Sequence, residues 1–510
     1  TYITTAIPYV NAAPHIGFAM ELVLADVQAR YHRLRGSDAR FLTGTDENSL
    51  KNVLAAEAEG ISTAALVERN AASFRSLRES LDLSFDDFIR TSAEPRHRAG
   101  VDKLWQACAA RGDIYKRGYR GLYCVGCEQF YAEADLVAGS CPEHGTRPEL
   151  VEEENYFFRL SRYQAQVLDL LESGTLRVVP EHYRNEVIAF VKGGLEDFSI
   201  SRSSQRARGW GIPVAGDPSQ VIYVWFDALG NYITALDYAA EGPLYEHYWR
   251  GASERVHVIG KGITRFHAVY WPAMLLSAGV PLPTTVSVHG YLTVEGQKIG
   301  KSLGNAIAPE DLVARFGGDT LRYFLCRHIR SGRDGDFSAA RVSQARDSEL
   351  ADQLGNLLKR TVSMISRYYD GRIPPATEAA GHFAEQAQRV RSDVERAFAN
   401  LRIDDAIDAV WSLVATANKY VVERAPWTLA RHRDDPTTEA ALATTLYNLA
   451  ELLRIVAHYL GPFLPRAAAE IRRQLGLDEG SSEDWETATQ WGGTAAGTAI
   501  EVGPALFPKA

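Results

Sequence analysis

The first 42 residues combine two apolar runs with one amphipathic stretch, and this pattern leaves the chain few folds to adopt. Residues 2–7 and 39–42 are predicted strands, and residues 21–35 between them have the apolar spacing of a helix. Strands joined through a helix run parallel, because a parallel connection needs a crossover of about a dozen residues or more. The pattern therefore predicts a βαβ unit at the start of the chain.

A second unit of the same kind is predicted much later. Residues 256–259 and 285–288 are predicted strands, with a helix expected at residues 266–276 between them. Two such halves build one doubly wound, Rossmann-type parallel sheet, which binds its ligands at the carboxyl ends of the strands. The predicted fold class is therefore α/β.

Two other regions have different patterns. A long insertion with clustered cysteines and glycine-rich turns separates the two halves, and residues from about 345 to 475 have helical periodicity nearly throughout. The second pattern predicts a bundle of α-helices. The tail, residues 481–510, is rich in glycine, threonine and proline, and we expect it to pack loosely over the surface.

The composition narrows the class of protein. The chain has 46% hydrophobic and 23% charged residues, as soluble globular proteins do, and its net charge of −9 argues against a generally basic coat for nucleic acid. A local basic face stays possible. We expect no membrane span and no secretory signal, because long apolar windows and a positively charged start are both lacking. Thr1 is not an initiator methionine, which leaves open that a few residues precede it.

The cysteines are few and clustered. Three of the five, Cys124, Cys127 and Cys141, lie in one short stretch that ends with His144. This arrangement favours metal ligation in a reducing compartment over a disulfide framework, so we expect a cytoplasmic protein. Each pair of ligands is separated by two residues, and a complete set of four thiolate and imidazole donors suits a structural zinc ion. The alternative is four unrelated surface residues.

Two short motifs point to a nucleotide. His15 and Gly17 stand between the first predicted strand and helix, where free N–H groups and the positive end of the helix favour phosphate. Lys298 and Lys301 lie in a glycine-flanked loop and can neutralise charge on a triphosphate. Taken alone, the first motif is better explained by a satisfied turn histidine and the second by a solvated basic turn.

Together, the two motifs resemble the two signatures of class I aminoacyl-tRNA synthetases, and the chain is similar to the methionyl-tRNA synthetase family. The resemblance covers nearly the whole chain, and at this density chance agreement is negligible. The matching segments are residues 6–11, 14–15, 43–47, 155–158, 199–202, 223–228, 259–261, 266–272 and 304–305.

The resemblance implies a ligase that activates methionine with ATP and Mg²⁺ and transfers it to tRNA. It implies a structural Zn²⁺ as the resident metal. The residues it assigns to ATP are His15, Gly17, Phe18, Gly260, His289, Gly290, Lys298, Lys301 and Ser302. The catalytic residues among these are His15, Lys298 and Lys301, and Arg202 supports the site from the insertion.

The resemblance also assigns a methionine pocket. Its members are Ile7, Tyr9, Trp225, Leu229, Tyr232 and His267, with Asp46 holding the α-ammonium group as a charge-assisted partner. An apolar pocket with aromatic walls suits a polarizable thioether. Any one of these aromatic residues, taken singly, is better explained by core packing.

The helical region carries the residues that read the anticodon in the family. Asn356 and Arg360 are four apart and so share a helix face, and Trp427 follows a second helix. Polar groups of this kind contact exposed base edges, and an aromatic ring stacks on a base. Without the family, Asn356 and Arg360 are better explained as a solvated face.

The resemblance divides the chain into five segments. They are the first half of the catalytic domain (1–103), the insertion with the zinc knuckle (104–219), the second half of the catalytic domain (220–292), a signature-loop and stem-contact region (293–344), and a helical anticodon-binding domain with the tail (345–510). No appended dimerisation domain is visible, which predicts a monomer.

Four departures from the family cluster at the expected adenylate site. Phe18 replaces the second histidine of the first signature, Asn48 and Ser49 replace a histidine and a glycine, Gly262 replaces an aspartate, and Gly300 replaces a serine. Losing one transition-state donor typically costs on the order of 100-fold in rate.

Three interpretations follow from these motifs. The first is a working methionine–tRNA ligase with an unusual site. The second is a paralogue that adenylates an amino acid and passes it to a small, non-tRNA acceptor. The third is a non-catalytic tRNA-binding module. Retained Asn356, Arg360 and Trp427 favour the first, and the altered positions 18 and 262 favour the second.

Overall fold

The computed structural model describes residues 1–124, 129–131, 133–142, 145–299, 307–376, 382–477 and 484–509. Contacts within the chain group it into two compact units. The first contains Thr1–Pro14, Arg40–Leu77 and Phe85–His289, and the second contains His15–Ala39, Arg78–Ser84 and Gly290–Ala510. Each unit therefore combines segments that are far apart in the sequence. The five-segment division stays a prediction.

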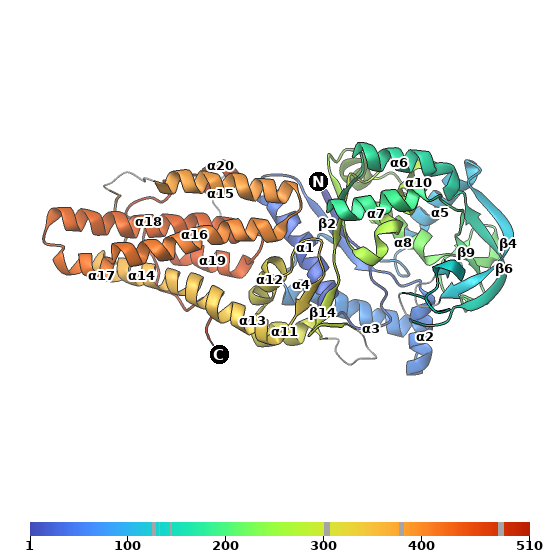
Figure 1. Ribbon diagram of the computed structural model, residues 1–510, viewed down its shortest axis with the longest axis horizontal. Coiled ribbons are helices and arrows are strands. Elements are labelled where there is room, and N and C mark those ends of the chain that lie inside the picture. The colour runs from blue at the N-terminus through green and yellow to red at the C-terminus, as the bar shows by residue number, and fades with distance from the viewer. Residues whose placement is uncertain are drawn as a thin grey trace. The chain divides into compact units, whose positions relative to one another are not determined.

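The first unit is built on a six-stranded sheet (Figure 1). In spatial order the strands are β3 (Asp87–Arg90), β2 (Arg40–Thr45), β1 (Tyr2–Thr5), β12 (Arg255–Gly260), β13 (Thr285–His289) and β7 (Arg177–Val179). Every neighbouring pair is parallel. The predicted parallel α/β sheet is confirmed, and its strand order changes direction between β1 and β12, where doubly wound sheets bind ligands.

The central strand β1 is enclosed by the protein on all sides. All four of its residues are buried. Ile3 pairs with Phe41 on one side and Val256 on the other. A strand with neighbours on both edges and cover on both faces carries few polar residues. The two threonines of β1 are satisfied locally, because the hydroxyl of Thr4 lies 2.7 Å from Nδ1 of His257 and the hydroxyl of Thr5 lies 2.7 Å from that of Thr43.

Helices connect the strands of this unit. They are α2 (Leu50–Glu59), α3 (Thr63–Arg75), α5 (Pro95–Ala110), α6 (Gln164–Ser173), α7 (Glu181–Lys192), α8 (Val224–Thr234), α9 (Pro243–Tyr245) and α10 (Trp271–Ala278), while α4 (Leu77–Ser80) falls on the division between the units. The helix expected at residues 266–276 starts with a π-helical turn, Phe266–Tyr270, and continues as α10. Gly279 ends it with φ of 68°, a left-handed conformation that glycine adopts at little cost.

The insertion forms two small antiparallel sheets within the first unit. One has the order β5 (Gln129–Tyr131), β4 (Ile114–Cys124), β6 (Glu149–Phe158) and β8 (Phe198–Ser199). The other has the order β10 (Pro213–Val214), β11 (Asp217–Ile222) and β9 (Ser201–Ser203). The second sheet leads directly into α8, so it joins the insertion to the elements of the six-stranded sheet.

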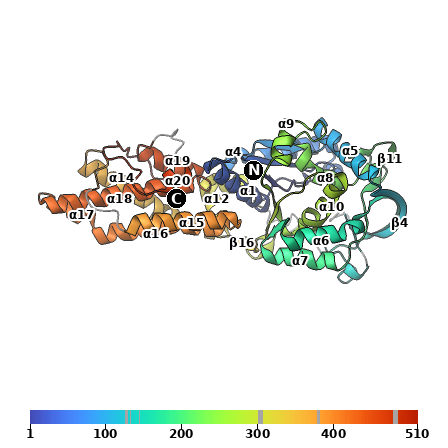
Figure 2. The same cartoon turned by 90° about the horizontal axis from the view of Figure 1, so that it is seen from above.

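The second unit is mostly helical, as predicted for its C-terminal part. Its helices are α1 (Ile16–Leu34), α11 (Pro309–Phe316), α12 (Gly318–Arg327), α13 (Ala339–Ala345) with a π-helical continuation (Arg346–Gly355), α14 (Asn356–Tyr368), α15 (His382–Ala399), α16 (Ile403–Arg424), α17 (Pro426–Leu429), α18 (Pro436–Leu460), α19 (Pro465–Gln474) and α20 (Trp485–Thr489). Its strands are β14 (Leu292–Val294), β15 (Gln297–Lys298) and β16 (Gly335–Phe337). Within this unit α15 lies along α16, and α16 along α18 (Figures 1 and 2).

Helix α1 packs with the C-terminal helices of its unit. Asp26 forms an ion pair of 2.8 Å with Arg322 of α12, and both side chains are fully buried. Near the other end, the ring of Tyr31 stacks on Phe398 of α15 with centroids 3.7 Å apart, and Trp485 meets the same tyrosine edge-on. The helix starts five residues before the expected residue 21, because His15 caps it.

Helix α18 is the one stretch, among the residues that the structure describes, with the length and apolar composition to cross a membrane. In this structure 83% of its apolar window is buried inside the protein. It packs against α16 and α19. This is the environment of a core helix.

We expected the C-terminal tail to pack loosely, but part of it is bound to α18. Arg454 of α18 donates to the carbonyls of Ala488 and Gln490, at 2.8 Å and 2.6 Å. The buried carboxylate of Glu451 accepts from the backbone N–H groups of Gly492 and Thr494, at 2.7 Å and 2.9 Å. The tail is held because a buried carboxylate needs donors, and the backbone of a glycine-rich turn supplies them.

Candidate active site

The carboxylate expected to hold the α-ammonium group lies at the carboxyl end of β2. Asp46 is 3% exposed, and its backbone N–H donates to the carbonyl of Pro8 at 2.9 Å. It pairs in parallel with Tyr9, another predicted pocket residue. Asn52 donates to the Asp46 carbonyl at 3.2 Å and fixes the turn. The structure therefore brings Tyr9 and Asp46 together at the predicted sheet edge.

One of the four departures makes a specific contact in the first unit. The side-chain N–H of Asn48 donates to Oδ2 of Asp227 at 3.1 Å, and the backbone N–H of Asn48 reaches Oδ1 of Asp46 at 3.3 Å. Asp227 is fully buried on α8, with Nε2 of His97 3.5 Å from its other oxygen. Burial raises the pKa of Asp227, and the contacts with His97 and Asn48 oppose that rise. Asn48 thus joins the Asp46 turn to α8.

The predicted methionine pocket has one polar pair. Nδ1 of His267 lies 2.9 Å from the carbonyl of Ile263, which can only accept, so Nδ1 carries the ring proton. Nε2 is then the acceptor for the hydroxyl of Tyr232, 2.7 Å away. Burial lowers the pKa of His267 to about 4, so the ring is neutral at physiological pH. A neutral pair in an apolar wall fits an uncharged side chain.

The remaining pocket residues form an aromatic and aliphatic wall. Trp225 stacks on Phe266 with ring centroids 3.7 Å apart and an angle of 5° between the planes. Leu229 lies one turn further along α8 and is 2% exposed. Ile7 is partly buried against the same core. Phe266 was not predicted as a pocket residue, although its stacking on Trp225 makes it part of the wall.

Arg202 joins the insertion to the start of α8. Its Nη1 donates to the hydroxyl of Ser199 at 2.9 Å and to the carbonyl of Ser201 at 2.7 Å. Its guanidinium lies over the rings of Tyr223 and Tyr123, at 4.2 Å and 5.0 Å from their centroids. Tyr223 is the residue that precedes α8. Arg202 therefore contacts the residue that precedes the helix carrying Trp225.

Two residues expected to bind ATP lie side by side in the first unit. Gly260 and His289 pair in register at the carboxyl ends of β12 and β13. A Cβ atom built on Gly260 would lie 3.4 Å from Cε1 of His289, in van der Waals contact with the ring. Gly262, the third departure, lies exposed in the turn that follows β12.

The first signature caps α1 in the second unit. Nδ1 of His15 accepts a hydrogen bond of 3.1 Å from the backbone N–H of Gly17. In the neutral ring Nε2 then carries the proton and is a donor. A Cβ atom built on Gly17 would lie 3.0 Å from Cε1 of His15. Phe18 follows in the first turn and is half-buried.

The two signatures meet within the second unit. A Cβ atom built on Gly17 would lie 3.9 Å from Cδ1 of Ile299, in the second signature. The backbone N–H of Ile16 donates to the carbonyl of Ile307 at 3.2 Å, just beyond that signature. Gly300, Lys301 and Ser302 lie outside the described residues.

The second signature begins on a hairpin. β14 and β15 pair antiparallel, with Thr293 opposite Lys298. Glu295 and Gly296 form the two-residue turn, with φ of 51° and 76°. Gly290 comes just before the hairpin, and a Cβ atom on it would lie 2.2 Å from the carbonyl carbon of Arg333. The side chain of Lys298 is not among those that the structure describes.

The structure describes half of the predicted zinc ligands. Cys124 and Cys141 are each 1% exposed and form no disulfide. Sγ of Cys124 is 3.9 Å from the hydroxyl of Thr146. Cys127 and His144 lie outside the described residues. Among the residues that are described, no group of three or more His, Cys, Asp or Glu side chains could hold a metal ion.

The predicted anticodon residues lie on helices of the second unit. Asn356 begins α14 and donates to Asp352 at 3.2 Å, and Arg360 is exposed one turn later. Trp427 lies on α17 and is 43% exposed.

Comparisons with known proteins agree with these features. The family described as tRNA synthetases class I (M) matches residues 1–147 and 135–362, and the anticodon binding domain of methionyl tRNA ligase matches residues 374–510. A methionine–tRNA ligase of Caldanaerobacter subterraneus subsp. tengcongensis is 43% identical over 512 residues, which is 100% of this chain and 78% of that protein. One from Brucella suis biovar 1 is 44% identical over 92% of this chain and 90% of its own length.

Solved structures give the same result. Mycobacterium tuberculosis methionyl-tRNA synthetase in complex with methionyl-adenylate has a TM-score of 0.93 and 40% identity, covering 99% of both chains. The free-state structure of that enzyme has a TM-score of 0.87 and 38% identity, covering 100% of this chain and 98% of that one. The sheet, the helical C-terminal region and the matches over the whole chain leave one assignment: this chain belongs to the methionine–tRNA ligase family of class I aminoacyl-tRNA synthetases.

Proposed function

We propose that this chain forms methionyl-adenylate from methionine and ATP and transfers the methionyl group to tRNA, using the residues assigned from its motifs. The observation that carries the proposal is the adjacency of Gly17 to Ile299 within the second unit. Two motifs far apart in the sequence have no structural need to meet, whereas a bound triphosphate needs donors from both.

The first step is a displacement at the α-phosphorus of ATP. A carboxylate oxygen of methionine forms the new P–O bond, and the bond to the bridging oxygen breaks, so that pyrophosphate leaves with Mg²⁺. Nε2 of His15 is a donor, because Nδ1 accepts from Gly17. Lys298 and Lys301 supply positive charge toward the phosphates, and such donors act most strongly on charge that develops in the transition state.

Methionine is recognised by one charge and one neutral pocket. Asp46 holds the α-ammonium group, and its burial strengthens that contact. The side chain enters the wall formed by Trp225, Leu229 and the Tyr232–His267 pair. Because His267 is neutral, the pocket does not attract a charged side chain.

The second step uses tRNA. The terminal ribose hydroxyl attacks the carbonyl carbon of the adenylate, and AMP leaves with the phosphate oxygen. Selection of the tRNA rests on Trp427, which offers a ring to stack on an anticodon base, and on Asn356 and Arg360, which offer polar groups to its edge. The exposure of the Trp427 ring supports this role.

We infer that Cys124, Cys127, Cys141 and His144 hold one structural zinc ion. Cys124 and Cys141, the two of these ligands that the structure describes, are buried and form no disulfide, which suits ligands. Bound zinc would cross-link the knuckle and take no part in the reaction. Elemental analysis should find one zinc per chain, and Cys141→Ser should lose it. Purified protein that folds without zinc would contradict this assignment.

The altered positions do not remove the machinery. Asn48 keeps a donor on Asp227 where the family has histidine. Phe18 removes one donor toward ATP, and we expect a slower first step rather than a different reaction. The second interpretation, a paralogue with a small acceptor, rests on these same positions and is tested with the first.

The test is ATP–pyrophosphate exchange with each standard amino acid, followed by tRNA charging with the one that responds. We expect exchange with methionine and charging of methionine tRNA. Exchange without charging would favour the small-acceptor paralogue, and no exchange at all would favour the non-catalytic module. A monomeric state and a cytoplasmic location stay predictions from the sequence.

A further inference from the structure

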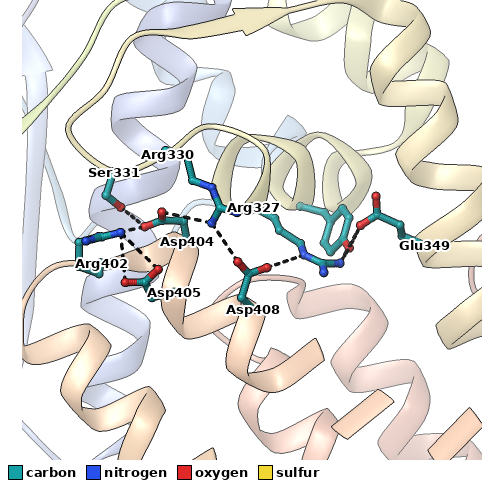
Figure 3. A network of polar contacts seen from close by, with 9 residues as sticks. Arg327, Arg330, Ser331, Glu349, Arg402, Asp404, Asp405 and Asp408 are labelled. Atoms are coloured by element: carbon teal, nitrogen blue, oxygen red, sulfur yellow. Dashed lines mark hydrogen bonds and ion pairs between the residues drawn. The ribbon is translucent and has the colours of Figure 1, made fainter. Parts of the chain in front are cut away.

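An ionic network joins the start of α16 to the loop that follows α12 (Figure 3). The two oxygens of Asp408 receive Nε of Arg327 and Nη1 of Arg330, each at 2.9 Å. Asp404, one turn earlier, accepts from the hydroxyl of Ser331 and lies 3.4 Å from Arg330. Two carboxylates of one helix therefore hold one short loop.

These contacts keep a buried carboxylate ionised. The side chain of Asp404 is fully buried. Burial alone would raise its pKa, but the hydrogen bond from Ser331 and the charges of Arg402 and Arg330 outweigh it and lower the pKa. An ionised buried group fixes its partners tightly, because any displacement leaves it unpaired. The loop is thereby held at a defined place on α16.

The same loop supports the strand that precedes the second signature. The carboxylate of Asp334 accepts from the backbone N–H of Tyr291 at 2.8 Å, and Gly335 donates back to the Tyr291 carbonyl at 2.9 Å. The backbone at Gly290 lies directly against Arg333, where no Cβ atom would fit. The loop and the entry to β14 are therefore held together by these contacts.

The support continues to Lys298 through β16. Oδ1 of Asp336 accepts from the hydroxyl of Thr293 and from the backbone N–H of Gly296, both at 2.7 Å. Thr293 is opposite Lys298 in the hairpin. The contacts thus run without interruption from α16, through the loop and β16, to the backbone of Lys298.

We propose that Asp404 and Asp408 are positioning residues for the second nucleotide signature. They touch no substrate; they hold the loop on which the hairpin carrying Lys298 rests. This inference rests on the proposed role of Lys298 in binding the phosphates. The C-terminal end of α16 leads to Trp427, which is proposed to bind tRNA. The inference gives the N-terminal end of the same helix a role in adenylate formation, which needs no tRNA.

The experiment measures pyrophosphate exchange by the full-length chain without tRNA. Asp408→Asn should lower kcat about tenfold and leave the KM for methionine unchanged, because a small displacement of a catalytic group affects the transition state most. Asp404→Asn should act in the same direction. Arg330→Lys keeps the charge and should retain most of the rate.

Asp405→Asn is the matched control. Asp405 lies on the same turn of α16, but its carboxylate pairs with Arg402, at 3.2 Å, rather than with the loop. It should keep the wild-type kcat. Thermal unfolding of each variant separates a loss of stability from a loss of position.

Two results would overturn the proposal. One is a normal kcat for Asp408→Asn, even with a lowered melting temperature, while Lys298→Ala is impaired. The other is an equal loss in Asp405→Asn. If Lys298→Ala exchanges at the wild-type rate, the phosphate assignment of Lys298 is itself wrong, and the positioning role is overturned with it.

Discussion

The side-chain amide of Asn48 donates to the buried carboxylate of Asp227 across 3.1 Å, and so ties the turn after β2 to helix α8. The turn carries Asp46, and the helix carries Trp225 and Tyr232. One hydrogen bond therefore connects the group expected to hold the ammonium with the wall expected to hold the side chain. Asn48 is also one of the positions predicted to differ from the family, and its side-chain amide supplies a donor to Asp227.

Replacing Asn48 by leucine should weaken methionine activation. The change leaves the buried Asp227 oxygen without its donor, which costs about 1–3 kcal/mol for such a group. We expect kcat/KM for methionine in pyrophosphate exchange to fall about tenfold or more. Asn48→His, the residue usual in the family, should retain activity because imidazole is also a donor. A leucine variant as active as the wild type would show that the contact is dispensable.

Tyr232→Phe should raise the KM for methionine about tenfold with a smaller effect on kcat. It removes the donor to Nε2 of His267 and leaves a buried acceptor unpaired in the pocket. Tyr2→Phe is the matched control, because its hydroxyl donates to the carbonyl of Tyr232 at 2.9 Å and not to the pocket. Steady-state exchange kinetics measure both. Equal KM changes in the two variants would mean that only packing was disturbed.

Lys301→Ala should lower the rate of adenylate formation about 100-fold while changing the Kd for ATP only a few-fold. A cation that acts on developing charge contributes to the transition state more than to the bound substrate. Single-turnover kinetics and equilibrium ATP binding separate the two quantities. Lys192→Ala removes a surface lysine paired with Glu172 and serves as control. Equal losses in rate and affinity would reduce Lys301 to a binding residue.

Trp427→Ala should lower tRNA charging about ten- to 100-fold and leave pyrophosphate exchange nearly unchanged. Stacking on one base is worth about 1–3 kcal/mol, and the exchange reaction needs no tRNA. Val422→Ala, on α16, removes another exposed apolar side chain, 66% exposed, and should have little effect. Indifference of charging to Trp427→Ala would make the anticodon residues inherited remnants.

Acid should destabilise the second unit in part through His458. Burial lowers the pKa of His458 to about 4, and the positive charges of Arg472 and Arg454 act in the same direction. Well above pH 6.5 the ring is neutral in both the folded and the unfolded chain, so protonation of His458 costs no stability. As the pH falls below 6.5, the unfolded chain takes up the proton first, so the free energy of unfolding decreases. The decrease levels off below about pH 4, where the folded chain is protonated too.

From these values the loss between pH 8 and pH 5 is about 2 kcal/mol for this one group. His458→Gln should remove that part of the pH dependence, measured as the free energy of unfolding in urea at each pH. Substituting the exposed His432 by Gln controls for the loss of an imidazole. Some pH dependence should remain, because burial also lowers the pKa values of His257 and His267. An unaltered slope in His458→Gln would contradict the prediction.

The sheet was predictable because its signals are local. The apolar runs at residues 2–7 and 285–288 gave strands that the structure places at Tyr2–Thr5 and Thr285–His289. The helix after β1 was placed too late, because Gly17 near its start is a poor helix former and His15 is an uncommon cap. Its first turn is fixed by a hydrogen bond from the Gly17 N–H to that cap, which residue preferences do not reveal.

The contacts that complete the site were not predictable in the same way. Asn48 and Asp227 are 179 residues apart, and nothing near either residue signals the other. The tail was expected to be loose because glycine and threonine are common in it, yet a buried carboxylate, Glu451, collects its backbone N–H groups. The composition of a segment indicates its own conformational preferences, but it does not reveal that a distant buried carboxylate will bind its backbone N–H groups.

The pairing of Asp26 with Arg322 has a consequence for how the protein is made. Helix α1 emerges from the ribosome early, and Asp26 has two early partners, Arg30 and Ser84. Its third partner, Arg322, and the rings of Phe398 and Trp485 that pack on Tyr31 are synthesised much later, so we expect α1 to complete its packing only then. The proposed contact of His15 with ATP, at the start of this helix, should therefore be completed late in synthesis.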